Sequence, residues 1–303
     1  MFSLLRHLST PSWSSAPPRS EQNVHADSLA QAAGGERRDD EVPPTTYLVE
    51  GNIGAGKSTL CRTLSRALGA TSVYELIGKR FLTAFYERPS TYAFALQMVQ
   101  QAKRAAVVMH TNSVATADTP ITILDRSVVG DYAFALWNWA SGNMSDQDWQ
   151  LYREQAGADV AAALDSAGAA LRHTTIIFLN DDARSCHVRQ TRRDQGTPTI
   201  EYPYLAGLHA THLICMACIP PTYTIVELHW AEYAELAQSA TSDDGERPSE
   251  RLDEVYRVLR STPDVQSARR ATLAVRARRA CDELTNIGAA ERLSQFLKTA
   301  LRM

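Results

Sequence analysis

Five short apolar runs are spaced along the chain, and longer stretches with the apolar spacing of helices separate them. The runs cover residues 46–50, 71–75, 121–124, 174–180 and 222–228. Short runs rich in β-branched residues are typical of buried β-strands. Strands that alternate with helices form parallel sheets with right-handed crossovers. The pattern therefore predicts an α/β fold, with a doubly wound five-stranded parallel sheet and helices on both faces.

The first of these strands runs directly into a glycine-rich loop. Residues 51–58 read GNIGAGKS, which fits the pattern GxxxxGK[ST], and a helix-like stretch over 59–68 follows and ends at Gly69. Glycines let backbone N–H groups surround phosphate oxygens, and the N-terminus of the helix adds partial positive charge. The loop predicts a P-loop NTPase-like fold that binds a nucleoside triphosphate, with Lys57 on the β- and γ-phosphates and Ser58 on Mg²⁺. The expected triphosphate-binding residues are Gly51, Asn52, Ile53, Gly54, Ala55, Gly56, Lys57, Ser58 and Thr59.

Charged residues stand at the ends of two further strands. Glu75 ends the second run, and Asp125 and Arg126 follow the third. Ligands of parallel sheets bind beyond the carboxyl ends of the strands, which places these charges near the phosphate loop. Glu75 can take the proton of a hydroxyl acceptor, Asp125 can hold Mg²⁺ directly or through water, and Arg126 can stabilise the acceptor oxygen or the moving phosphoryl group. The alternative for Asp125 and Arg126 is a structural ion pair.

A segment with helical spacing follows Pro89 and carries a glutamine among its apolar residues, Gln97. The amide of Gln97 offers a donor and an acceptor together, which suits the edge of a nucleobase. The nearby Tyr86, Phe94 and Arg104 favour a substrate-binding role for this segment over an exposed helical glutamine.

Arginines cluster between the fourth and fifth runs, where residues 184–193 read RSCHVRQTRR. Arg189, Arg192 and Arg193 lie within about one and a half helical turns, and a turn signal over 194–196 follows them. Arginines on a mobile segment can close over a triphosphate and neutralise the charge that develops during transfer. The alternative is the solvated basic face of a helix.

These motifs together resemble the deoxynucleoside kinase family. The resemblance is carried by VEGNIGAGKSTL, the Asp125-Arg126-Ser127 triplet, FYERPSTYAFALQ and the arginine segment, and it extends over residues 46–260. It implies transfer of a phosphoryl group from ATP, or another nucleoside triphosphate, to the 5′-hydroxyl of a deoxynucleoside, with Mg²⁺, in a homodimer.

The resemblance also implies the catalytic roles of individual residues. Glu75 matches the family's catalytic base, Asp125 its metal-associated acid, and Arg126 its arginine near the 5′-oxygen. Within the arginine segment, Arg189 and Arg193 are the favoured pair that stabilises the transferred charge.

Five residues match the part of the family's site that holds the nucleoside. Gln97 matches the glutamine that reads the base edge, and Tyr86 and Glu201 match the pair that holds the sugar 3′-hydroxyl. Arg104 and Asp131 match a charged pair near the base that thymidine-preferring members tend to lack. The resemblance therefore implies a preference for purine deoxynucleosides or deoxycytidine over thymidine.

Composition agrees with an ordinary enzyme of 303 residues, 44% of them hydrophobic and 21% charged. The net charge of −3 argues against a nucleic-acid partner, and no apolar run approaches the roughly 20 residues of a membrane span. Five scattered cysteines form no disulfide framework, and we expect Cys215 and Cys218 in a buried helix. Two alternative functions stay open, a nucleoside monophosphate kinase such as a thymidylate kinase, and a non-catalytic family member with a structural role.

The two ends of the chain differ from its middle. Residues 1–45 are rich in serine and arginine with no acid before Glu21, which is typical of a transit peptide and a mitochondrial location. The alternative is a disordered tail on a cytoplasmic protein. We expect the kinase domain over 46–261, with a last helix near 249–260, and a helical C-terminal extension over 262–303. That extension is expected to pack on the domain as a solvated hairpin, or else to contact another subunit or an anionic partner.

Overall fold

The computed structural model of the protein describes residues 45–75, 78–114, 121–167, 174–192, 200–220, 223–229 and 263–301. The N-terminal tail up to residue 44, the lid residue Arg193 and the expected helix 249–260 lie outside these ranges.

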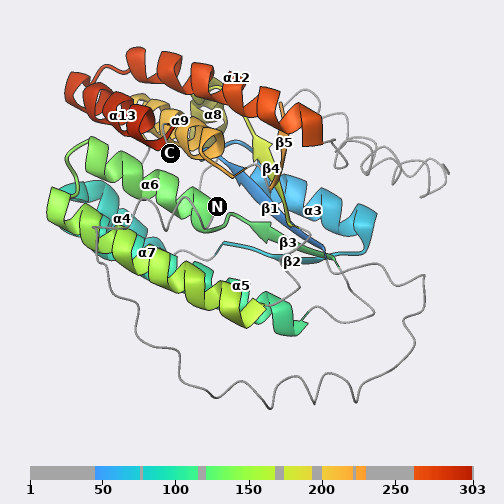
Figure 1. Cartoon of the computed structure of the whole chain (residues 1–303). Coiled ribbons are helices and arrows are strands. Elements are labelled where there is room, and N and C mark those ends of the chain that lie inside the picture. The colour runs from blue at the N-terminus through green and yellow to red at the C-terminus, as the bar shows by residue number, and fades with distance from the viewer. Residues whose placement is uncertain are drawn as a thin grey trace, which may run out of the picture.

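Five parallel strands form one sheet, as predicted (Figure 1). They are β1 (Thr45–Gly51), β2 (Thr71–Val73), β3 (Ile121–Asp125), β4 (Thr174–Leu179) and β5 (Thr224–Leu228). Their order is β2-β3-β1-β4-β5, so β1 is the central strand, with β3 and β2 on one side and β4 and β5 on the other. In the register of β1 and β3, Val49 lies opposite Asp125. The loop after β1 and the charged residues after β3 therefore leave the sheet side by side, at the same edge.

The described helices cover both faces of the sheet. They are α3 (Lys57–Leu68), α4 (Lys79–Glu87), α5 (Pro89–Val114), α6 (Val128–Ala140), α7 (Asp146–Ala167), α8 (Ala183–Thr191), α9 (Tyr202–Ala217), α12 (Pro263–Asp282) and α13 (Ile287–Ala300). Side chains alternate between two cores, since successive residues of a strand point to opposite faces. Tyr47 and Val49 of β1 pack with Leu60 and Leu64 of α3. Leu48 joins the larger core beneath α5, α6, α9 and α12.

The second strand is shorter than the apolar run that predicted it. The run over 71–75 forms a strand only as far as Val73, and Tyr74 and Glu75 leave the sheet. Helix α3 ends at Gly69, as expected, with that residue in the left-handed conformation at φ 59°.

The C-terminal helices pack on the domain and share its larger core. Leu273 and Ala277 of α12 and Leu293 of α13 are fully buried members of that core. Arg270 of α12 donates to the carbonyls of Ile219, Pro220 and Tyr223 at 2.7, 2.9 and 2.7 Å. Arg270 therefore ties α12 to the backbone of the segment that leads into β5.

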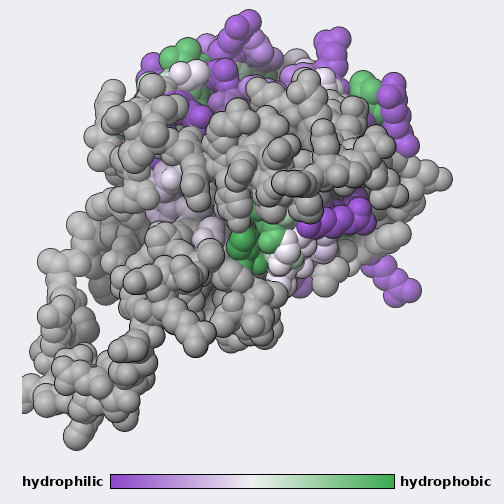
Figure 2. Space-filling model, turned by 90° about the vertical axis from the view of Figure 1, so that its right-hand side faces the viewer, coloured by the Kyte–Doolittle hydropathy of each residue, from purple (hydrophilic) through white to green (hydrophobic). Residues whose placement is uncertain are grey.

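The outer side of α12 is mainly polar, although Val275 is exposed there as well. Hydrophilic side chains gather along the top of the molecule in Figure 2, which is where α12 lies in Figure 1. Arg276, Arg278 and Arg279 are exposed on this helix. Across the described ranges, no helix combines the length and the apolar character that a membrane crossing requires.

Replacing Arg270 tests the attachment of α12. Arg270→Ala removes donors from three carbonyl groups, so we expect it to lower the free energy of unfolding by about 1–3 kcal/mol. Urea denaturation measures this change. Arg278→Ala is the matched control, because Arg278 lies on the same helix and is exposed. Equal effects of the two substitutions would contradict the attachment.

Candidate active site

The glycine-rich loop between β1 and α3 is folded tightly against neighbouring elements. Gly54 and Gly56 have positive φ angles of 81° and 95°, a conformation that suits glycine. A Cβ on Gly54 would lie 2.4 Å from the carbonyl oxygen of Cys186 in α8. The Asn52 amide donates to the carbonyl of Leu205 in α9 at 2.9 Å. The loop is thus fixed by two helices far from it in sequence.

Lys57, the first residue of α3, is buried beneath this loop. Its ammonium group donates to the carbonyl of Asn52 at 2.8 Å. Burial, together with the nearby positive charge of Arg126, lowers the pKa of Lys57 to about 8, although neighbouring carboxylates oppose this shift. A polyanion bound in the loop would stabilise the charged form.

Two oxygen-bearing side chains meet next to the loop. Ser58 Oγ donates to Asp125 Oδ2 at 2.5 Å. The other carboxylate oxygen, Asp125 Oδ1, is buried without a hydrogen-bond partner among the described residues. Asp125 thus presents an unused acceptor beside the hydroxyl of Ser58.

Glu75 lies between two guanidinium groups. Its Oε1 accepts from Arg104 Nη2 at 2.5 Å, and its Oε2 accepts from Arg126 Nε at 3.3 Å. Burial by itself raises the pKa of Glu75, but Arg126 and Arg104 outweigh burial and hold that pKa below its ordinary value. Glu75 is therefore an ionised carboxylate at neutral pH.

The backbone at Arg126 is unusual and is held by a buried carboxylate. Within the described ranges, Arg126 is the single non-glycine residue with positive φ, at 75°. Such a conformation costs about 1–3 kcal/mol and persists only where neighbours enforce it. The backbone N–H of Arg126 donates to the carbonyl of Val49 at 2.9 Å. Ser127 donates through its backbone N–H and its hydroxyl to Glu50 Oε1, at 2.7 and 2.5 Å.

Glu50 is a site residue that the sequence analysis did not single out. It is fully buried, and burial raises its pKa. A Cβ on Gly130 would lie 2.4 Å from Glu50 Oε2, so the start of α6 also packs on this carboxylate. The sequence did contain a signal for this role, because Glu50 is an acidic residue in an otherwise apolar strand, directly before the glycine loop.

A cavity of about 290 Å³ joins the loop to the strand ends. Of the predicted residues, those that line it are Ile53, Gly54, Lys57, Ser58, Glu75, Tyr86, Gln97, Asp125, Arg126 and Asp131. Lys57 and Glu75 therefore share one cavity. Further lining residues were not indicated by the sequence, among them Phe134 of α6 and Tyr204 of α9.

Three predicted substrate residues do not line this cavity: Phe94, Arg104 and Glu201. Phe94 packs against the larger core, and Glu201 is exposed at the start of α9. Arg104 lies behind the cavity wall, where its Nε donates to Asp131 Oδ2 at 3.2 Å. Burial raises the pKa of Asp131 to about 7, and Arg104 opposes that rise.

One predicted lid arginine already contacts the glycine loop. Arg189 of α8 donates through Nε to the carbonyl of Gly54 at 2.7 Å, and through Nη2 to Asp181 at 2.5 Å. Arg192 follows at the exposed end of the helix. Helix α8 is thus positioned over the phosphate loop.

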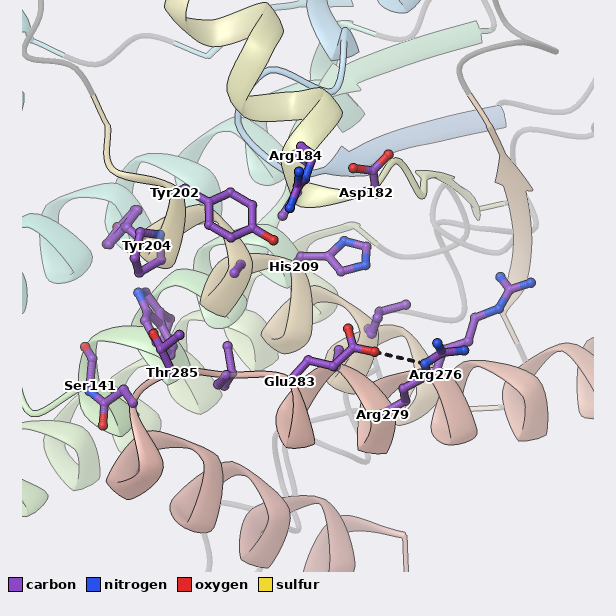
Figure 3. Close-up of a pocket in the computed structure, with 18 of the residues that line it drawn as sticks. Ser141, Asp182, Arg184, Tyr202, Tyr204, His209, Arg276, Arg279, Glu283 and Thr285 are labelled. Carbon is purple, nitrogen blue, oxygen red and sulfur yellow. Dashed lines mark hydrogen bonds and ion pairs between the residues drawn. The ribbon is translucent and has the colours of Figure 1, made fainter.

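A second cavity, of about 490 Å³, is larger but lacks the phosphate loop and the strand-end charges. Figure 3 shows it between α8, α9 and α12, with Tyr202, His209 and Glu283 in its walls. Tyr204 lines both cavities. We place the candidate chemistry in the smaller cavity, because that cavity contains the convergent charged groups.

A glycine loop ahead of a helix, a buried lysine and a strand-end acid beside a serine define a P-loop phosphotransferase. Comparison with known families specifies the class further, because the family model described as deoxynucleoside kinase matches residues 47–243. The chain therefore belongs to the deoxynucleoside kinase family.

Several curated proteins are similar to this chain. Deoxycytidine kinase 2 of Gallus gallus is 26% identical over an alignment of 191 residues, and the match covers 54% of this chain and 71% of that protein. Deoxyguanosine kinase of Lactobacillus johnsonii is 35% identical over 111 residues, 36% of this chain and 47% of that protein. Deoxyguanosine kinase of Dictyostelium discoideum is 28% identical over 166 residues, 53% of this chain and 55% of that protein. The chain spans about half the length of the latter two.

A solved structure supports the fold. Deoxyadenosine kinase from M. mycoides, with the products dCMP and dCDP bound, aligns with a TM-score of 0.51 at 16% identity. The alignment covers 72% of this chain and all of that one. The predicted P-loop fold is thereby confirmed.

Replacing Gly54 tests the close packing of α8 on the loop. Gly54→Ala places a Cβ against the Cys186 carbonyl at positive φ, so we expect a loss of about 2–4 kcal/mol in unfolding free energy. Triphosphate affinity should also fall at least about tenfold, because the loop must shift. Thermal unfolding and nucleotide titration measure the two effects.

Gly69→Ala serves as the control for this substitution. Gly69 also has positive φ, at 59°, but a Cβ there would meet nothing within 4 Å. We expect a loss of about 1 kcal/mol and unchanged nucleotide affinity. If both variants lost the same stability, the clash with Cys186 would not be the cause.

Proposed function

We propose that this chain transfers a phosphoryl group from ATP, or another nucleoside triphosphate, to the 5′-hydroxyl of a deoxynucleoside. The observation that carries the proposal is the shared cavity of Lys57 and Glu75. The ammonium group of Lys57, which suits the phosphate donor, and the carboxylate of Glu75, which suits the hydroxyl acceptor, thus line the same cavity. Such an arrangement favours in-line transfer, because both reactants are held together and oriented.

The side of the cavity that would bind the phosphate donor is built from the glycine loop and two basic side chains. Backbone N–H groups of the glycine loop and the N-terminus of α3 suit the phosphates. Lys57 adds a positive charge that a triphosphate would stabilise, and Arg189 lies against the loop carbonyl of Gly54. We propose that Arg189 turns to the phosphates when the donor binds, with Arg193 as the second lid arginine.

The residues next to the loop fit Mg²⁺. A hard cation takes oxygen ligands, and the Ser58 hydroxyl lies against Asp125, whose Oδ1 is unpaired among the described residues. We propose that Ser58 and Asp125 hold the ion, with Asp125 binding directly or through water. Bound Mg²⁺ would supply positive charge that offsets the charge of the phosphates.

The acceptor side centres on Glu75 and Arg126. Glu75 is ionised and reaches the cavity, so it can accept the hydroxyl proton of the substrate. Arg126 donates to Glu75 and lines the same cavity, so its charge can stabilise negative charge that develops on the transferred group.

The nucleoside would occupy the part of the cavity lined by α4, α5 and α6. Gln97 offers an amide to the base edge, and Tyr86 offers a hydroxyl to the sugar. Similar proteins are named as deoxycytidine, deoxyguanosine and deoxyadenosine kinases. Together with the Arg104–Asp131 pair, these names support a purine deoxynucleoside or deoxycytidine as the preferred substrate over thymidine.

The two alternative functions have less support. The matching family model is that of deoxynucleoside kinases, which gives the monophosphate kinase alternative no support. A structural, non-catalytic role would not need Lys57, Glu75 and Arg126 in one cavity. A homodimer and a mitochondrial location are further proposals, resting on the family resemblance and on the composition of residues 1–45.

A competition assay tests the substrate. The full chain is given ATP, Mg²⁺ and the four deoxynucleosides together, and the 5′-monophosphates are quantified. We expect a purine deoxynucleoside or deoxycytidine to be phosphorylated fastest and thymidine slowest. Thymidine monophosphate is offered in a parallel assay. If it were phosphorylated and no deoxynucleoside were turned over, the protein would be a monophosphate kinase and the proposal would be rejected.

Replacing Glu75 tests the base. Glu75→Gln keeps the shape of the side chain but removes the proton acceptor, so we expect turnover to fall by at least about 10²-fold. Nucleoside binding should change little. Steady-state kinetics and calorimetric titration with the nucleoside measure both effects.

Glu87→Gln is the matched control, because Glu87 is exposed at the end of α4. It should leave turnover unchanged. A normal rate in Glu75→Gln would reject the assignment of Glu75 as the base.

A further inference from the structure

A buried histidine lies directly behind the cavity and has no role in the chemistry described above. His212 is in the middle of α9, is 1% exposed and does not line the cavity. Its Nε2 lies 3.3 Å from Nη1 of Arg126, a residue 86 positions away in the sequence. The sequence offered no signal for this contact.

The partners of His212 determine where its proton lies. Nδ1 is 2.7 Å from the carbonyl oxygen of Leu208, and a carbonyl can only accept a hydrogen bond. Nδ1 must therefore carry the proton. Arg126 can only donate, so Nε2 must be unprotonated and accept from the guanidinium. His212 is thus a neutral imidazole in the Nδ1–H tautomer.

Three groups together restrain the guanidinium of Arg126. Glu75 accepts from its Nε at 3.3 Å, and His212 accepts from its Nη1 at 3.3 Å. The ring of Phe134 lies beneath the guanidinium, 4.6 Å from ring centroid to Cζ. Phe134 in turn packs edge-on against His212, with centroids 5.9 Å apart. The side chain of Arg126 is fixed on the cavity side and from behind.

We propose that His212 is a positioning residue that aims Arg126 at the transferred phosphoryl group. The inference rests on the function proposed above for Arg126. A neutral acceptor suits this task, because it orients the guanidinium without neutralising its charge. A carboxylate in the same place would add a second ion pair to the one with Glu75 and further weaken the field of Arg126 in the cavity.

The surroundings keep His212 neutral. Burial is the main cause that holds the pKa of His212 well below its ordinary value, and the positive charge of Arg126 acts in the same direction. Lys57 and His209 add smaller effects of the same sign. Protonation would place a hydrogen on Nε2 against the guanidinium and break the contact.

Two substitutions separate the two contacts of His212. Glutamine carries its amide at the reach of Nε2, so His212→Gln can keep the acceptor for Arg126. Asparagine carries its amide at the reach of Nδ1, so His212→Asn can keep the contact with Leu208 but not the one with Arg126. We expect His212→Asn to lower kcat by about 10–10²-fold, with the nucleoside KM within about threefold. His212→Gln should lose no more than about threefold in kcat.

A double-mutant cycle distinguishes positioning from a general loss of structure. In the Arg126→Ala background, His212→Asn should change kcat by less than about twofold, because the residue on which it acts is gone. If His212→Asn lowered kcat equally in both backgrounds, or if His212→Gln lost as much as His212→Asn, the proposal would be overturned.

A spectroscopic measurement tests the geometry without any activity assay. Imidazole ¹⁵N shifts of the wild-type chain should report the Nδ1–H tautomer, and His212 should not titrate with a pKa of about 6.5. In Arg126→Ala, the His212 pKa should rise, because a like charge has been removed. An Nε2–H tautomer of His212, or titration of His212 with its ordinary pKa in the wild type, would contradict the inference. Absence of kinase activity with the expected tautomer would instead reject the proposed function and with it the catalytic purpose of the contact.

Discussion

The ionised carboxylate of Glu75, held between two guanidinium groups, is the interaction on which the rest of the site depends. Each of its oxygens accepts from a different arginine, Arg104 of α5 and Arg126 after β3. These three side chains come from segments far apart in sequence, and burial makes each charge costly without its partners. The pairing therefore draws helix α5 and the ends of β2 and β3 into one arrangement around the cavity.

The backbone of Arg126 is strained at its place in this cluster. The conformation at φ 75° is maintained by the Val49 carbonyl and by the buried carboxylate of Glu50 acting through Ser127. Strain of this kind is common where a side chain must be aimed. The same stretch, Glu50 to Lys57, supplies both the support for Arg126 and the phosphate loop, so the donor and acceptor sides share one scaffold.

Helices α8 and α9 connect this scaffold to the rest of the molecule. Cys186 and Arg189 of α8 pack on Gly54, while Leu205 of α9 accepts from Asn52 and His212 of α9 contacts Arg126. A movement of α8 during nucleotide binding would therefore change its contacts with the phosphate loop at Gly54. The larger cavity in Figure 3 lies between α8, α9 and α12. The C-terminal helix α12 is therefore a neighbour of the two helices that hold the phosphate loop and Arg126.

The sequence by itself determined the sheet, the phosphate loop and the meeting of Glu75, Asp125 and Arg126, because parallel strands bring their carboxyl ends to one edge. It did not reveal that Arg104 lies behind the cavity wall, or that Phe134 and Tyr204 line the cavity. Only the tertiary structure decided those positions. Helical spacing shows which residues share a face, but the direction of that face depends on how each helix packs against segments distant in sequence.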